Sequence, residues 1–177
     1  MIRLFVGLEI PESLRQRLAM LHGGVPGAKW QSAEQMHLTL RFVGDVSEAM
    51  ATDIDDALTT IRAPSFDMEI AGVGEFGGKM PRALWAGVRS DEELQHLHRK
   101  IDAILRRLGM PPDERKFSPH VTLARLKNAP RAKVMEFISH HALFADGSFR
   151  VEQFVLFSSQ LGSGGSVYHV EREYGLS

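Results

Sequence analysis

The chain contains no cysteine. Disulfide bonds, thiol nucleophiles and cysteine-ligated zinc are therefore excluded as sources of stability or chemistry. A chain without disulfides fits a reducing compartment, and we expect the protein to be cytoplasmic. Whatever reaction it performs must use other side chains.

No single sign of charge dominates either, since 21 Lys and Arg residues balance 22 Asp and Glu residues for a net charge of −1. Nucleic acid, if it is the partner, must be held by a local basic patch and not by an overall cationic field. Long apolar runs are also absent. The first apolar stretch ends at Glu9 and Pro11, which is too short for a membrane span and lacks the cleavage site of a signal peptide. We expect no membrane partner.

One short motif occurs twice: residues 37–40 read His-Leu-Thr-Leu and residues 120–123 read His-Val-Thr-Leu. Successive side chains of a strand point to opposite faces, so each copy places an imidazole and a hydroxyl on one face and two apolar side chains on the other. With eight His and five Thr in 177 residues, chance predicts about 0.2 occurrences of His-x-Thr. The repeat is therefore the strongest signal in the sequence.

Hydrophobic periodicity and turn residues predict mixed helices and strands. Strands are expected near residues 3–9, 37–44, 66–70, 83–88, 120–125, 149–158 and 168–174, and helices near 11–22, 47–61, 91–108 and 130–141. Glycine-rich residues 75–79 are expected to form a loop. This order indicates an α+β fold. Because the two motifs are 83 residues apart (120 − 37), close to half the chain, we expect two similar lobes with a cleft between them.

Two imidazoles opposed across a cleft can act as an acid and a base near neutral pH. One takes a proton from the attacking oxygen while the other gives a proton to the departing oxygen. The hydroxyls of Thr39 and Thr122 can donate hydrogen bonds to anionic oxygens in the transition state. Such a site suits displacement at phosphorus within a diester.

Other chemistries fit less well. Neither His-Glu-x-x-His nor a carboxylate at ligand spacing accompanies the motif histidines, so we expect no metal site and no cofactor. There is no nucleophile elbow for a serine triad, and the glycine-rich segment lacks the Gly-Lys-Ser/Thr of a phosphate loop.

These residues resemble the 2H phosphoesterase superfamily, and within it the RNA 2′,3′-cyclic phosphodiesterases, also called the 2′-5′ RNA ligase family. The resemblance extends over almost the whole chain and includes residues 3–8, 37–44, 81–85, 117–125 and 156–162 with Tyr168. It implies a bilobal α+β fold formed by residues 1–177 as one domain of two interleaved lobes. Antiparallel sheet would line a central groove, with helices outside.

The resemblance also implies metal-independent hydrolysis of 2′,3′-cyclic phosphate at RNA ends, tRNA fragments among them, to 2′-phosphomonoesters, and in some members 2′-5′ ligation. By this resemblance His37 and His120 are catalytic, with His120 as the base toward water and His37 as the acid. Thr39, Thr122 and Arg125 would bind substrate. A monomer is expected.

Arg125 poses a conflict. Strict alternation points it away from His120, whereas Arg41 would point with His37. Either a β-bulge re-aims Arg125, or the phosphate contact belongs partly to Arg41.

Several alternatives stay open. The substrate could instead be a small cyclic nucleotide such as ADP-ribose 1″,2″-cyclic phosphate, or the chain could be an RNA end-binding module without turnover. Trp30, Phe42 and Phe76 could stack on bases, although core packing is favoured for each. Histidines 96, 98, 140 and 141 are interpreted as solvated surface residues.

Overall fold

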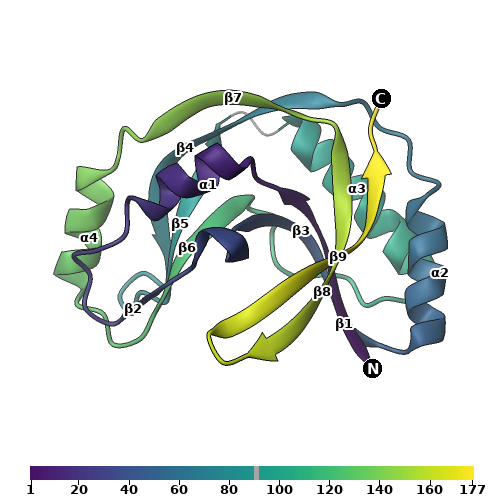
Figure 1. The fold of residues 1–177 in the computed structure, drawn as a ribbon, viewed down its shortest axis with the longest axis horizontal. Coiled ribbons are helices and arrows are strands. Elements are labelled where there is room, and N and C mark those ends of the chain that lie inside the picture. Colours follow the sequence, from purple (N-terminus) through teal and green to yellow (C-terminus); the bar gives the residue numbers. More distant parts are fainter. Residues whose placement is uncertain (90–91) are drawn as a thin grey trace.

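The computed structural model describes residues 1–89 and 92–177 as one curled antiparallel sheet with helices outside it (Figure 1). Its elements in chain order are β1 (Ile2–Glu9), α1 (Glu12–Ala19), β2 (Ala28–Trp30), the 3-10 helix η1 (Ala33–Gln35), β3 (His37–Val46), α2 (Glu48–Leu58), β4 (Phe66–Phe76), β5 (Ala83–Arg89), α3 (Glu92–Arg107), β6 (His120–Leu126), α4 (Arg131–His140), β7 (Ala145–Val151), β8 (Gln153–Gly162) and β9 (Gly165–Gly175).

The strand order β7-β4-β5-β6-β3-β1-β8-β9 divides the sheet into two halves that meet between β6 and β3, and β2 pairs with β6 off this path. The motif strands are thus the innermost strand of each half. At this junction one residue pair, Leu38 with Val121, links the two strands in the described part of the chain. The expected α+β fold with two similar lobes is confirmed, and its centre is the pair of motif strands.

Helices flank both halves (Figure 1): α1 and α4 lie on the side of β4, while α2 and α3 lie against β1 and β3. Helix α3 buries Leu94, Leu97, Ile101 and Leu105 at the spacing of one helical face. Gly109, with a φ of 91°, follows its end in a conformation that favours glycine. Asp91, the residue at which this helix was expected to begin, lies outside the described residues.

The apolar partners of the motif explain why these strands are buried on one face. Leu38, Leu40, Val121 and Leu123 are all at most 3% exposed and belong to the main hydrophobic core. Burying such a side chain contributes about 1.5–3 kcal/mol. The core therefore fixes which face of each strand carries the imidazole and the hydroxyl.

Four expectations need correction. Strand β2 was missed because three residues are too few for a periodic signal. Strand β4 continues through Phe76, paired with Ala83 of β5, so the loop expected over residues 75–79 is shorter. The expected strand 149–158 is two strands, because β7 pairs with β4 in one half and β8 pairs with β1 in the other. The last strand is longer than predicted, because it pairs with β8 along its whole length.

None of the helices among the described residues combines the length and the apolar character that a membrane crossing requires.

Candidate active site

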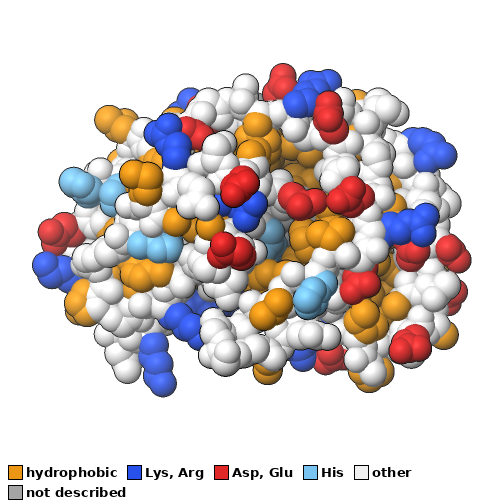
Figure 2. Space-filling view, viewed as in Figure 1, with side chains coloured by type: hydrophobic (Ala, Val, Ile, Leu, Met, Phe, Trp, Pro, Cys, Tyr) orange, Lys and Arg blue, Asp and Glu red, His pale blue; other side chains and the backbone are white. Residues whose placement is uncertain are grey.

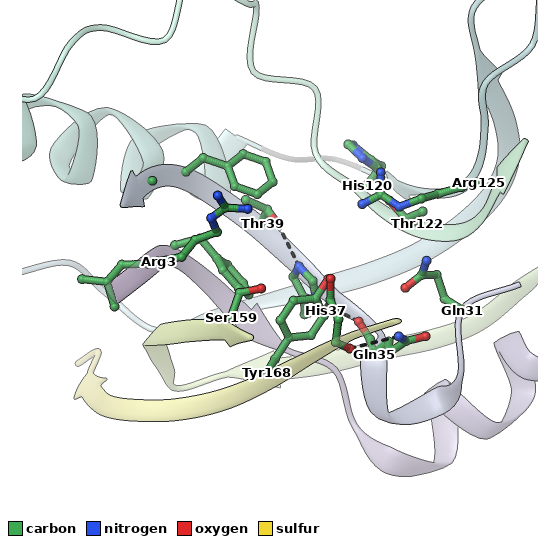
Figure 3. A pocket seen from close by; sticks show the side chains of 15 residues that line it. Arg3, Gln31, Gln35, His37, Thr39, His120, Thr122, Arg125, Ser159 and Tyr168 are labelled. Carbon is green, nitrogen blue, oxygen red and sulfur yellow. Dashed lines mark hydrogen bonds between the residues drawn. The ribbon is translucent and has the colours of Figure 1, made fainter. Parts of the chain in front are cut away.

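The two motifs open into one pocket of about 390 Å³. His37 and Thr39 reach it from β3, and His120 and Thr122 reach it from β6 (Figure 3). Arg125 reaches it from β6 as well, and the remaining polar lining comes from other strands and loops: Arg3, Gln31, Gln35, Ser159, Ser166 and Tyr168. The structure thus brings together all five side chains that the sequence singled out. Their catalytic and binding roles remain predictions.

Both motif strands carry a β-bulge just after the threonine. Opposite β1, Thr39 and Arg41 pair with the consecutive residues Gly7 and Val6, which leaves Leu40 as an extra residue. Opposite β5, Thr122 and Ala124 pair with the consecutive residues Trp85 and Leu84, which leaves Leu123 extra. A bulge reverses the alternation of the residues after it. Each strand therefore faces the pocket with its first, third and sixth residues.

This bulge decides between the two arginines. Arg125, the sixth residue of its strand, is exposed and lines the pocket. Arg41 is turned inward and only 6% exposed. Its guanidinium donates to Asp102 Oδ1 at 2.9 Å and to the backbone carbonyls of Phe42 and Pro111. Arg41 is thus committed to an ion pair with Asp102 and does not line this pocket, so Arg125 stays the candidate for the phosphate contact.

The two imidazoles are held in the same way. Nδ1 of His37 bonds the carbonyl of Gln35 at 2.9 Å, and Nδ1 of His120 bonds the carbonyl of Ser118 at 2.8 Å. A carbonyl oxygen only accepts, so each Nδ1 carries the hydrogen and each neutral ring has its free lone pair on Nε2. The hydroxyl of Thr39 lies 2.9 Å from Nε2 of His37 and donates to it in that tautomer. Nε2 is therefore the atom of each ring that can exchange a proton with a substrate.

Burial lowers the pKa of both rings by different amounts. His37 is enclosed by aromatic rings, with centroids 4.7 Å away for Phe5, 4.8 Å for Tyr168 and 5.8 Å for Phe157. Burial lowers its pKa from 6.5 to about 4, and the positive charges of His120 and Arg125 contribute to the decrease, while the bond to Gln35 opposes it. The neutral form of the His37 imidazole is therefore favoured at neutral pH.

For His120 the lowering of the pKa also comes mainly from burial, and the bond to Ser118 opposes it. Fewer aromatic rings surround it: the centroid of Phe76 lies 4.9 Å away and that of Trp85 6.5 Å away. Of the two rings, His37 is thus the one held more firmly in its neutral form.

Sequence reasoning missed two features of the pocket wall. Tyr168, on the β8–β9 hairpin, packs edge-on against His37 and closes one side of the pocket. Gln35 anchors the same hairpin, since its side-chain amide donates to the carbonyl of Ser166 at 3.0 Å. Tyr168 belonged to the motif resemblance, but only the strand pairing of β8 and β9 shows that it reaches His37.

The aromatic side chains considered for base stacking differ in whether they pack in the core or line the pocket. Core packing is right for Trp30, which stacks on His22 and packs at a tilt against Phe137. It is wrong for Phe42, which is 54% exposed and lines the pocket because the bulge turns it outward. Among the four histidines expected at the surface, His98 is half-buried and stacks on Phe117 with centroids 4.1 Å apart.

The pocket is suited to an anion. Among the described residues, its lining includes the guanidiniums of Arg3 and Arg125 and contains no carboxylate. Arg3 is already paired with Asp45 at 2.9 Å, which leaves Arg125 as the stronger source of positive charge. Across the described ranges, no three His, Asp or Glu side chains gather as metal ligands would. Two Nε2 atoms that can exchange a proton with a substrate, two threonines and an arginine together suit a phosphate with one arriving and one departing oxygen.

Comparison with known proteins agrees with this geometry. The sequence model of the 2′-5′ RNA ligase superfamily matches residues 10–162. A protein of Thermotoga maritima named RNA 2′,3′-cyclic phosphodiesterase is 33% identical over 96% of this chain and 92% of its own. One of the same name from Aeropyrum pernix is 41% identical over 65% of this chain and 66% of its own.

Solved structures show the same fold. The crystal structure of Escherichia coli LigT complexed with 3′-AMP superposes with a TM-score of 0.82 at 25% identity, over 99% of this chain and 98% of that one. A Thermus thermophilus protein, TT0787, superposes with a TM-score of 0.80 at 29% identity, over 98% and 97% of the two chains.

Proposed function

The chain belongs to the 2′-5′ RNA ligase superfamily, and we propose that it hydrolyses 2′,3′-cyclic phosphate ends of RNA to 2′-phosphomonoesters. The observation that carries this proposal is the pairing of two imidazoles, each with its Nδ1 hydrogen engaged by a backbone carbonyl, in one carboxylate-free pocket. The relatives named RNA 2′,3′-cyclic phosphodiesterase supply the substrate class.

In the proposed reaction the oxygen of a water attacks phosphorus and the bond from phosphorus to the 3′ oxygen breaks. Nε2 of His120 takes the proton of the water, and Nε2 of His37 gives a proton to the departing 3′ oxygen. Burial favours the neutral form of His37 in the free protein, so this assignment requires the bound phosphate anion to stabilise the protonated form of His37. No step in this scheme passes through a metal ion.

The remaining pocket residues would hold the phosphate. The guanidinium of Arg125 would bind its non-bridging oxygens, since a planar fork of donors matches phosphate geometry. The hydroxyls of Thr39 and Thr122 would donate to the same oxygens as charge develops on them. In the free protein the hydroxyl of Thr39 donates its hydrogen bond to Nε2 of His37. Substrate binding must therefore break that bond.

The deciding experiment incubates the protein with a short RNA that ends in a 2′,3′-cyclic phosphate, in the presence of EDTA, and identifies the product by ³¹P NMR. We expect a 2′-phosphomonoester at a rate that EDTA does not change. A 3′-phosphate product, a requirement for added metal, or absence of turnover would each overturn the proposal. ADP-ribose 1″,2″-cyclic phosphate, assayed alongside, reveals whether a small cyclic nucleotide is the better substrate.

The proposal extends to the setting of the enzyme. We expect a cytoplasmic monomer with tRNA fragments among its substrates, and 2′-5′ ligation as a parallel reaction, in which a 5′-hydroxyl takes the place of water as the attacking group. Light scattering of the purified protein tests the monomer. Incubation with tRNA halves followed by sizing of the RNA tests ligation.

A further inference from the structure

A second pocket of about 200 Å³ adjoins the first at the motif strands. It shares Thr39, Phe42 and His120 with the first pocket, so the two spaces are in contact at the reacting groups. The rest of its wall comes from Leu40 and Arg41 of β3, from the end of β4, from Arg82 before β5, and from the segment that precedes β6. The proposed hydrolysis makes no use of this second space.

Its lining is rich in positive charge. Arg82, Arg115 and Lys116 all border it and are exposed, against a single carboxylate, that of Asp113. Asp113 lies 3.6 Å from Arg115 and engages it weakly. Within the described ranges neither Arg82 nor Lys116 has a salt bridge. Across the face in Figure 2, by contrast, basic and acidic side chains are interspersed. A local excess of cations is the kind of patch that a protein of net charge −1 needs to hold nucleic acid.

Aromatic side chains complete the wall. Phe42 stands 54% exposed between the two pockets, and Phe76 and Phe117 line the second pocket. An exposed phenylalanine beside uncompensated cations is the combination with which proteins bind single-stranded RNA, since bases stack on the ring while the cations hold the backbone.

Contacts with β3 and α3 hold the segment that carries Arg115 and Lys116 in place. A guanidinium nitrogen of the buried Arg41 donates to the carbonyl of Pro111, and the ring of Phe117 stacks on His98 at an interplanar angle of 6°. The side-chain amide of Gln95 donates to the carbonyl of Phe117 at 3.4 Å. The second pocket is therefore largely formed before a ligand arrives, which lowers the entropic cost of binding.

We propose that this second pocket binds the penultimate nucleotide of the RNA, with its phosphodiester near Arg82 and Lys116 and its base against the phenylalanines. The substrate class is then an oligonucleotide of at least two residues and not a cyclic mononucleotide. This inference rests on the proposed function, because it takes the cyclic phosphate to lie between His37 and His120. The first pocket holds the terminal nucleotide, and the chain continues past Thr39 and Phe42 into the second.

The test compares a nucleoside 2′,3′-cyclic phosphate with a dinucleotide that carries the same cyclic end. For the wild-type protein we expect kcat/KM to be about tenfold or more higher for the dinucleotide, the size of one base stacked on an aromatic ring. The added phosphate should also steepen the salt dependence. The slope of log kcat/KM against log salt concentration should be more negative by about 0.7 for the dinucleotide than for the mononucleotide.

The variant Arg82→Gln/Lys116→Gln should lose the dinucleotide advantage and the extra salt slope, while kcat/KM for the mononucleotide stays within about twofold. Both side chains are exposed, so the free energy of unfolding should change little. Lys133→Gln is the matched control, because Lys133 is an exposed cation on α4 that borders neither pocket. It should leave both substrates unaffected.

Equal kcat/KM and equal salt slopes for the two substrates in the wild-type protein would overturn this inference while leaving the proposed function intact. An equal loss of kcat/KM on both substrates in the double variant would also overturn this inference and leave the proposed function intact. Absence of turnover on either substrate would instead remove the proposed function. The affinities of the dinucleotide and mononucleotide 2′-phosphates for the wild-type and double-variant proteins then decide whether the second pocket binds a nucleotide.

Discussion

Phe42 and Arg125 occupy equivalent positions on the two motif strands, each five residues after its histidine and each turned into the pocket by a bulge. The histidines, the threonines and the carbonyls that orient the rings are repeated at the same spacing of 83 residues. The sixth strand residue is where this repetition breaks, with an aromatic ring on one side and a guanidinium on the other. A phosphate bound between the strands therefore meets its main cation on the β6 side.

Removing either imidazole should abolish turnover without abolishing binding. His37→Ala and His120→Ala each delete one proton-transfer group, which is worth about 10² to 10⁴ in rate. We expect kcat to fall by that range in either variant, while the affinity for a 2′-phosphorylated product changes little because Arg125 remains. Single-turnover kinetics and equilibrium binding measure the two effects separately. Wild-type rates in either variant would eliminate the two-histidine mechanism.

The pH dependence of the free enzyme should be shifted toward acid. Activity requires one ring protonated and the other neutral, and burial favours the neutral form of both. With the pKa of His37 lowered to about 4 and that of His120 lowered below 6.5, the bell-shaped profile of kcat/KM should have its maximum below pH 6.5. The maximum of kcat should lie at higher pH, because a bound phosphate anion favours protonated imidazole.

Profiles of both parameters on the same substrate test this expectation. A maximum of kcat/KM above pH 7 would show that the rings are not held neutral in the free enzyme. The limbs of the profile report the pair of histidines jointly and do not assign one pKa to one ring.

Arg125 should matter for activity and not for stability. Arg125→Gln removes a charged donor facing the pocket, and hydrogen bonds to charged groups contribute about 1.5–3 kcal/mol, so kcat/KM should fall about tenfold to a hundredfold. Arg125→Lys should recover only part of this loss, because an ammonium cannot offer two parallel donors. The control is Arg89→Gln. Arg89 is an exposed arginine on β5, and it pairs with Glu69 of β4. Wild-type kcat/KM in Arg125→Gln would rule out a phosphate contact.

Arg41, in contrast to Arg125, should matter for stability and not for activity. Its guanidinium is buried and bonds Asp102, whose side chain is 17% exposed. Arg41→Gln leaves that carboxylate without its buried partner, although Arg106 still contacts it, and the free energy of unfolding should decrease by about 3 kcal/mol. Urea denaturation measures this, with the exposed pair of Arg150 and Asp67 as reference: Arg150→Gln should cost less than about 1 kcal/mol. Equal losses in the two variants would contradict the buried network.

The sequence was sufficient to predict which residues meet, because the His-x-Thr repeat and its apolar partners determine one face of each strand. It was insufficient to predict the course of either strand beyond the threonine. Alternation assumes a regular strand, and a bulge depends on the partner strand, which lies far away in the sequence. That dependence explains why Phe42 is exposed, Arg41 buried and Arg125 in the pocket. The split of β7 from β8 was hidden for the same reason, since only their partners β4 and β1 distinguish them.

The second pocket could not be foreseen either. Arg115 and Lys116 precede the motif in the sequence, where a solvated turn explains them equally well. Only the tertiary contacts of Phe117 with His98 and of Arg41 with the carbonyl of Pro111 place that turn beside the reacting groups. The organisation of residues 1–177 as one domain stays a prediction.

In the described part of the chain, one backbone pair, Leu38 with Val121, links β3 and β6, and each motif histidine is adjacent to it. Because the two strands are antiparallel, Phe42 and Arg125 lie four residues from that pair in opposite directions. The two imidazoles therefore lie nearest the point where the half-sheets join, and the aromatic ring and the guanidinium lie on opposite sides of it.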